Sequence, residues 1–92
     1  MTIKHLLKKD TYFDSVTLML INNEVKKLDG VTNAVVGMAT DYNVESLKRL
    51  ELFVPELQSA TPNDLVICVA AASDAQATDA VARSEKMLSV SM

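Results

Sequence analysis

The hydrophobic pattern of this chain centres on one unbroken apolar run, LVICVAA, at residues 65–71. Polar residues bound the run on both sides, at 61–64 and at 73–74. A strand covered on one face alternates apolar and polar side chains, whereas a strand covered on both faces is apolar throughout. Three β-branched residues and the absence of glycine and proline also favour a strand. We therefore predict that residues 65–71 form the inner strand of a sheet.

The first forty residues predict a strand, a helix and a second strand. Apolar and basic residues mix over 3–8, which indicates the first strand, and the largely apolar residues 31–39 indicate the second. Between them, aliphatic side chains recur at helical spacing from residue 18 to residue 28. The pair Asp14-Ser15 can cap the start of this helix, and Gly30 stands where a glycine would end it.

The remaining segments predict two further helices. Residues 41–51 carry a helical pattern, and residues 52–57 fit either a short helical turn that begins at their proline or an apolar lid. Ser73 and Gln76 have the spacing of a capping box, which predicts a last helix after the inner strand. Gly37 would weaken the second strand unless a bulge or a close backbone approach requires a glycine there.

The element order βαβ(α)βα predicts an α/β (α+β) protein with a ferredoxin-like sandwich, in which helices cover a three-stranded sheet. The connection at residues 40–64 is long for a hairpin, so the direction of the third strand stays open. A ferredoxin-like domain has a fourth strand, which is either absent here or supplied by a partner. Because an uncovered sheet edge invites pairing with a neighbour, a homodimer is one expected arrangement.

Composition changes this picture mainly by exclusion. With 92 residues, the chain is expected to be a single small domain, residues 1–92. A net charge of −3 argues against nucleic acid binding, which needs a concentrated basic surface. No apolar run approaches the roughly 20 residues of a membrane span, and no signal peptide is visible. We therefore expect a cytoplasmic protein that binds neither nucleic acid nor a membrane.

Few residues suggest chemistry. Cys68, the single cysteine, lies among aliphatic residues, where a thiol behaves as a small hydrophobe. One histidine and one cysteine do not make a zinc site with the usual ligands. The aspartates at turns are explained by capping, and the lysines around His5 by a solvated strand edge. We expect no catalytic residue, no metal and no cofactor in this chain, and an independent enzyme is the least favoured alternative.

Two polar loops are the candidate contact site. One follows the second predicted strand and the other precedes the third. If these strands are antiparallel neighbours, the end of one and the start of the next lie at the same sheet edge. The two loops would then present small polar groups together to a ligand or partner, although turn chemistry alone also explains them. The candidate contact residues are Thr40, Asp41, Asn43, Thr61, Asn63 and Asp64.

Three segments carry a family resemblance. They are Phe13-Asp14-Ser15-Val16 with Leu18-Met19, Met38-Ala39-Thr40 leading to Asn43, and Ala60-Thr61-Pro62-Asn63-Asp64 before an aliphatic strand. In order and spacing they resemble the N-terminal region of FdrA-type proteins, over nearly all of the chain. These proteins are acyl-CoA-synthetase-like and are related in their later domains to the α subunit of succinyl-CoA synthetase.

The resemblance implies a role in anaerobic purine (allantoin) breakdown, as part of a carbamoyltransferase that splits oxalurate into oxamate and carbamoyl phosphate. The family's nucleotide-binding and phosphoryl-transfer machinery belongs to the later domains, so no catalytic residue carries over to this chain. The first hypothesis is therefore a non-catalytic assembly or regulatory N-terminal module, whose partners are the remainder of an FdrA-like chain or carbamoyltransferase subunits. The alternative is a free-standing domain that binds a small ligand and dimerises through sheet edges.

Overall fold

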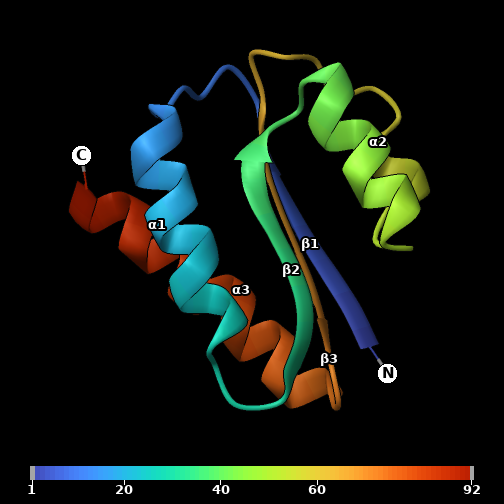
Figure 1. The fold of residues 1–92 in the computed structure, drawn as a ribbon, viewed down its shortest axis with the longest axis vertical. Coiled ribbons are helices and arrows are strands. Elements are labelled where there is room, and N and C mark those ends of the chain that lie inside the picture. Colours follow the sequence, from blue (N-terminus) through green and yellow to red (C-terminus); the bar gives the residue numbers. More distant parts are fainter. Residues whose placement is uncertain (1, 92) are drawn as a thin grey trace.

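The computed structural model describes residues 2–91 as an open three-stranded sheet between two layers of helix (Figure 1). The order of elements along the chain is β1 Thr2–Lys8, α1 Ser15–Lys26, β2 Val31–Met38, α2 Asp41–Arg49, the 3₁₀ helix η1 Pro55–Leu57, β3 Leu65–Ala71 and α3 Asp74–Ser91. The predicted α+β, ferredoxin-like arrangement is confirmed. No helix within the described residues is long and apolar enough to cross a membrane.

The inner strand is β3, as its apolar sequence predicts. The strand order is β1-β3-β2, and both outer strands run antiparallel to β3. This settles the direction that the long second connection left open. All seven residues of β3 are buried.

The two faces of β3 belong to two separate hydrophobic clusters. On one side, α1 and α3 pack over Leu65, Ile67, Val69 and Ala71. On the other side, the segment that contains α2 and η1 packs over the alternate residues Val66, Cys68 and Ala70. In Figure 1 the sheet is seen from its β2 edge, with α1 and α3 on the left and α2 on the right. Because side chains of a strand alternate between faces, burial on both sides requires the unbroken apolar run.

Helix α1 begins as predicted but ends earlier. The Asp14 carboxylate caps its start by accepting the backbone N–H of Thr17 at 3.1 Å. The last helical residue is Lys26, so the prediction that Gly30 ends the helix is wrong. Gly30 instead has a φ of +80° in the turn that leads into β2, which is a left-handed conformation that favours glycine. The side chain of Gln76 lies against it and leaves no room for a Cβ atom.

Of the two explanations for a glycine at position 37, a bulge and a close approach to the backbone, the structure supports the close approach. A Cβ atom at Gly37 would lie 2.9 Å from Nδ2 of Asn43. The irregularity of β2 lies elsewhere, between Val31 and Asn33, where the pairing register with β3 shifts. Residues 52–57 were predicted as either a short helical turn or an apolar lid, and the structure shows features of both. Pro55 begins a 3₁₀ turn, and the leucines at 52 and 57 are buried.

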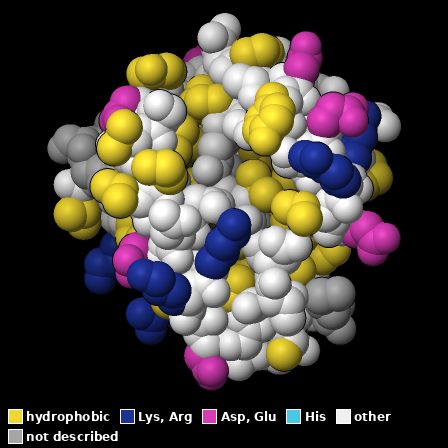
Figure 2. All heavy atoms as spheres, in the orientation of Figure 1, with side chains coloured by type: hydrophobic (Ala, Val, Ile, Leu, Met, Phe, Trp, Pro, Cys, Tyr) yellow, Lys and Arg dark blue, Asp and Glu magenta, His cyan; other side chains and the backbone are white. Residues whose placement is uncertain are grey.

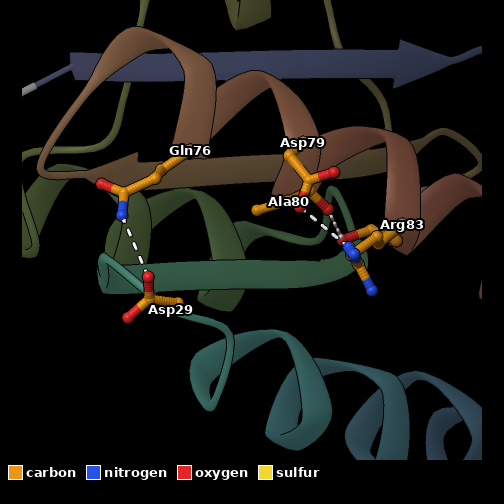
Figure 3. Close-up of polar contacts among 6 residues, drawn as sticks. Asp29, Gln76, Asp79, Ala80 and Arg83 are labelled. Carbon is orange, nitrogen blue, oxygen red and sulfur yellow. Dashed lines mark hydrogen bonds and ion pairs between the residues drawn. The ribbon is translucent and has the colours of Figure 1, made fainter.

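Side-chain hydrogen bonds fix the first turns of α3, and Figure 3 shows the contacts of Gln76 with Asp29 and of Arg83 with Asp79. One of the two bonds of the predicted capping box is present, since the backbone N–H of Gln76 donates to Oγ of Ser73 at 3.2 Å, and the Ser73 hydroxyl donates to Oε1 of Gln76 at 3.1 Å. Gln76 also donates through Nε2 to the Asp29 carboxylate at 3.3 Å, across the turn that leads into β2. One helical turn further on, Asp79 and Arg83 form the predicted i,i+4 ion pair at 2.8 Å.

Candidate functional site

Asp64 connects the end of β1, the end of β2 and the start of β3, which lie together at one end of the strands. Its carboxylate accepts the backbone N–H of Asp10 through Oδ1 and that of Thr61 through Oδ2, both at 2.9 Å. Its backbone carbonyl accepts the N–H of Ala39 at 2.9 Å. Asp64 is only 2% exposed. The expectation that the loop after β2 and the loop before β3 lie at the same sheet edge is therefore confirmed.

These hydrogen bonds also change the ionisation of Asp64. The N–H donors of Asp10 and Thr61 stabilise the charged carboxylate, and they hold its pKa below the ordinary value of an aspartate. Asp64 therefore stays ionised over the physiological pH range. Its role within this chain is to order the loops.

The other candidate contact residues are also engaged in local structure. Thr40 caps α2, because its Oγ1 accepts the backbone N–H of Asn43 at 3.2 Å. Asn43 donates through Nδ2 to the carbonyl of Met38 at 2.7 Å. Asn63 donates its backbone N–H to Oγ1 of Thr61 at 3.4 Å. Turn and cap chemistry accounts for these contacts, as the sequence allowed.

The six predicted residues do not converge on one cavity. Thr40 and Asn43 line a large groove beside β2. Asp41 lines a separate, smaller pocket, with Lys48 and Pro62. Contact of these residues with a ligand or partner stays a prediction.

The large groove lies between α1 and α2, over the outer edge of β2, and has a volume of about 560 Å³. Figure 2 shows it as the hollow in the centre of the face, bordered by hydrophobic side chains. Tyr12 and Tyr42 belong to its walls and are 79% and 75% exposed, and Met19 and Leu50 add exposed apolar surface. The only charged side chain among the described residues that line it is Lys26.

Asparagine side chains satisfy the backbone at the floor of this groove. Oδ1 of Asn22, from α1, accepts the N–H of Val36 at 2.7 Å. Asn43, from α2, covers the carbonyl of Met38. The outer edge of β2 is therefore partly closed by side chains from both flanking helices. The groove offers an apolar surface with amide and hydroxyl groups.

Sequence reasoning missed this groove. Its walls come from a loop, two helices and a strand that are adjacent only in the folded chain. The one local signal is that Tyr12 and Tyr42 each lie two residues from the N-cap residue of a helix, outside the apolar periodicity of that helix.

Cys68 and His5 lie opposite each other in the β1–β3 register. The Cys68 thiol is fully buried under the α2 layer, and this burial raises its pKa to about 12. A thiol with such a pKa stays protonated at neutral pH, whereas the thiolate is both the nucleophile and the metal ligand. The Cys68 thiol is therefore not a nucleophile at neutral pH.

Comparison with known proteins gives a family match over almost the whole chain. Residues 1–91 match the family described as AllF, heavy metal-associated domain. A protein of Escherichia coli K12, described as the uncharacterized protein YahF, is 49% identical over 69 residues. The aligned region covers 75% of this chain and only 13% of YahF. No solved structure matches the chain.

The description of the family raises the question of whether these residues suit a heavy metal. Soft metal ions are held by thiolate ligands, and the one thiol of this chain is buried in the apolar cluster on the α2 side of the sheet. Within residues 2–91, no three His, Cys, Asp or Glu side chains are grouped so that they could hold a metal ion. The donor set does not fit a heavy-metal site. The resemblance to FdrA-type proteins stays a prediction, and the chain belongs to the family of AllF heavy metal-associated domains.

Proposed function

We propose that this domain is a non-catalytic assembly module of a longer AllF-type protein, and that the groove between α1 and α2 is its docking surface. The observation that carries the proposal is the exposed apolar lining of this groove. The FdrA-type resemblance supports a role in allantoin (purine) breakdown, in the assembly or regulation of a carbamoyltransferase. The chain itself supplies a binding surface, and the chemistry belongs to other domains.

The physical argument rests on the two tyrosines. Both are about three-quarters exposed, and tyrosine supplies a large contact area with little loss of conformational entropy. Aromatic residues at the edge of a hollow are frequent anchors of protein interfaces. Because asparagines already satisfy part of the β2 edge, the occupant gains mainly from apolar contact rather than from strand addition.

The occupant that we propose is the remainder of the longer AllF-type chain. YahF supports this choice, because the region similar to this chain is a small share of that protein's length. Docking within one chain is effectively intramolecular and needs little intrinsic affinity, which suits a groove of modest size. Separate carbamoyltransferase subunits and small ligands are the competing occupants.

The test is a titration of the 92-residue chain with the remainder of an AllF-type protein, expressed separately and followed by calorimetry. We expect saturable binding that weakens about tenfold in Tyr12→Ala and Tyr42→Ala. Val90→Ala is the matched control, because Val90 is 79% exposed but does not line the groove. Unchanged affinity in both tyrosine variants would overturn the choice of surface.

A small-ligand function is the second candidate, because the groove volume lies within the range of about 300–1,000 Å³ that is usual for ligand pockets. Oxamate, oxalurate and a nucleotide are the ligands to test, since the FdrA-type resemblance implies them. A ligand that binds the folded state raises the melting temperature with its concentration. Such a rise, without binding to the remainder of the protein, would replace the assembly role by ligand sensing.

A further inference from the structure

The two edges of the sheet differ in how far they are closed. Asn22 and Asn43 cover backbone groups on the outer edge of β2, as described above. On the same edge, the N–H of Ala34 donates to Oδ1 of Asn33 at 3.1 Å. Among the described residues, no comparable side-chain bond covers the outer edge of β1. The open edge of this domain is therefore that of β1.

The pairing register shows which backbone groups face this open edge. In an antiparallel ladder, the N–H and C=O of a residue point to the same side, and successive residues alternate. Val36 points its N–H away from β3, toward Asn22, so its opposite residue, Ile67, points its backbone toward β1. Ile67 pairs with Leu6, which therefore faces inward. By alternation, the N–H and C=O groups of Ile3, His5 and Leu7 face outward.

The lysines of β1 do not block this edge. Lysine side chains on an edge strand usually oppose pairing with another strand. Here Nζ of Lys4 bonds to Asp74 at 3.1 Å, and Nζ of Lys8 bonds to Glu85 at 2.9 Å. Both acids belong to α3, so the ion pairs hold the lysines over the helix layer. The edge keeps free backbone groups while its positive charges are compensated.

We propose that the outer edge of β1 pairs antiparallel with the same edge of a second copy of this chain, with His5 at the two-fold axis. The result is a continuous six-stranded sheet. This surface lies at the opposite edge of the sheet from the α1–α2 groove, so the proposal is independent of the docking function.

The sequence of β1 is self-complementary in this register. Outward-facing residues must meet outward-facing residues, and the register that pairs all seven residues of β1 places His5 opposite His5 of the second copy and Ile3 opposite Leu7 of the second copy. Ile3, which is 37% exposed on the face of the α2 layer, thereby gains an apolar cross-strand neighbour.

On the α3 face, the same register avoids directly opposed positive charges. Lys4 lies opposite Leu6 of the second copy, and Lys8 lies opposite Thr2 of the second copy. No lysine directly faces another lysine. Lys8 of the second copy is a diagonal neighbour of Lys4, whose charge is compensated by Asp74. The register therefore satisfies both the apolar and the charged positions of the strand.

Light scattering of the 92-residue chain over a range of concentrations is the first measurement. We expect a monomer–dimer equilibrium whose dissociation constant rises at least about tenfold in Ile3→Asp. Val16→Asp is the matched control, because Val16 is 59% exposed on α1, away from β1, and this variant leaves the dissociation constant unchanged. A monomer at all concentrations would overturn the proposal.

Cross-linking tests the register. In a hydrogen-bonded antiparallel pair, opposite Cα atoms lie about 5.5 Å apart, which is within the range of a disulfide. The variant His5→Cys should therefore form a covalent dimer with oxidised glutathione. Lys4→Cys should form no covalent dimer, since the two copies of residue 4 are offset along the strands. The wild type should form none either, since Cys68 is buried. A dimer in which Lys4→Cys cross-links, or His5→Cys does not, would overturn the register.

A wild-type dimer that Tyr12→Ala disrupts and Ile3→Asp does not would overturn the choice of edge.

Discussion

At the scale of single residues, Cys68 shows how burial determines chemistry. Its side chain has no exposed surface, and the resulting desolvation disfavours the thiolate. A single cysteine in a protein of this family invites a metal-binding or redox interpretation. Its place in the inner strand instead makes it a packing residue of the α2 side of the sheet.

This assignment predicts both the reactivity and the energetics of Cys68. The native thiol should react with an aromatic disulfide reagent only through unfolding, so the labelling rate should rise with urea in parallel with the unfolded fraction. Cys68→Ser should lower the free energy of unfolding by about 1–3 kcal/mol, because a hydroxyl replaces the thiol in an apolar site. Cys68→Ala, which adds no polar group, should cost less. Immediate labelling of the native chain would contradict the assignment.

Asp64 predicts a specific loss of stability in acid. Its pKa in the folded state lies below the value of about 3.9 for an unfolded aspartate. The folded state therefore binds this proton less readily than the unfolded state. The stabilisation is complete above the unfolded pKa and is lost as the pH falls through the folded pKa.

Urea denaturation at a series of pH values tests this contribution. The wild type should lose stability below about pH 4. Asp64→Asn should be less stable than the wild type near neutral pH, because a neutral amide replaces the charged acceptor of two N–H groups. The difference between the two proteins should shrink as the pH falls. Parallel stability profiles would show that Asp64 does not contribute through its charge.

At the scale of elements, β3 contributes to both hydrophobic clusters through alternate residues. Ile67 has no exposed surface and belongs to the cluster under α1 and α3. Ile67→Ala should therefore lower the free energy of unfolding by about 2–5 kcal/mol, through lost burial and the cavity that remains. Leu20→Ala is the control, since Leu20 is 58% exposed on α1 and should change stability by no more than about 0.5 kcal/mol. Chemical denaturation of the two variants measures both values, and similar losses would contradict the inner position of β3.

The elements that could be predicted from sequence are those with a local physical signature. The strand at residues 65–71 could be predicted from its own composition, because burial on both faces removes every polar residue from a strand. The predicted end of α1 was wrong, because the glycine at position 30 is required by the turn and by its contact with Gln76, which is distant in sequence. The direction of β3 depends on how a long connection folds, and no residue within the strand encodes it.

The candidate site was predicted only in part for the same reason. The loops that carry Thr40 and Asp64 were expected at one edge, and the structure confirms this. The α1–α2 groove was not predicted, because its walls meet only after α1 and α2 have packed beside β2. An exposed tyrosine has no periodic pattern that distinguishes it from an ordinary surface residue. Such a site requires the tertiary structure.

At the scale of the whole molecule, the two proposed contact surfaces lie at opposite edges of one sheet. The groove borders β2, the pairing edge is β1, and β3 separates them. Neighbouring strands are about 4.8 Å apart, so the two surfaces share no residues in direct contact. Effects of substitutions at distant sites are usually additive.

Additivity can be measured with one variant from each surface. Tyr42→Ala should weaken docking of the remainder of the protein and leave the dimer dissociation constant unchanged. Ile3→Asp should have the opposite pattern, and the double variant should combine the two losses without a coupling term. Calorimetry and light scattering give the two constants. Coupled losses would show that one surface depends on the other.

The central place of the last strand also constrains how the polypeptide acquires its structure during synthesis. Neither β1 nor β2 pairs with the other, and both bond only to β3, which lies in the final third of the chain. A nascent chain that has not yet released residues 65–71 from the ribosome can form helices but no strand pair. Sheet assembly must therefore wait until residues 65–71 have left the ribosome, and the unpaired β1 and β2 stay accessible to chaperones until then.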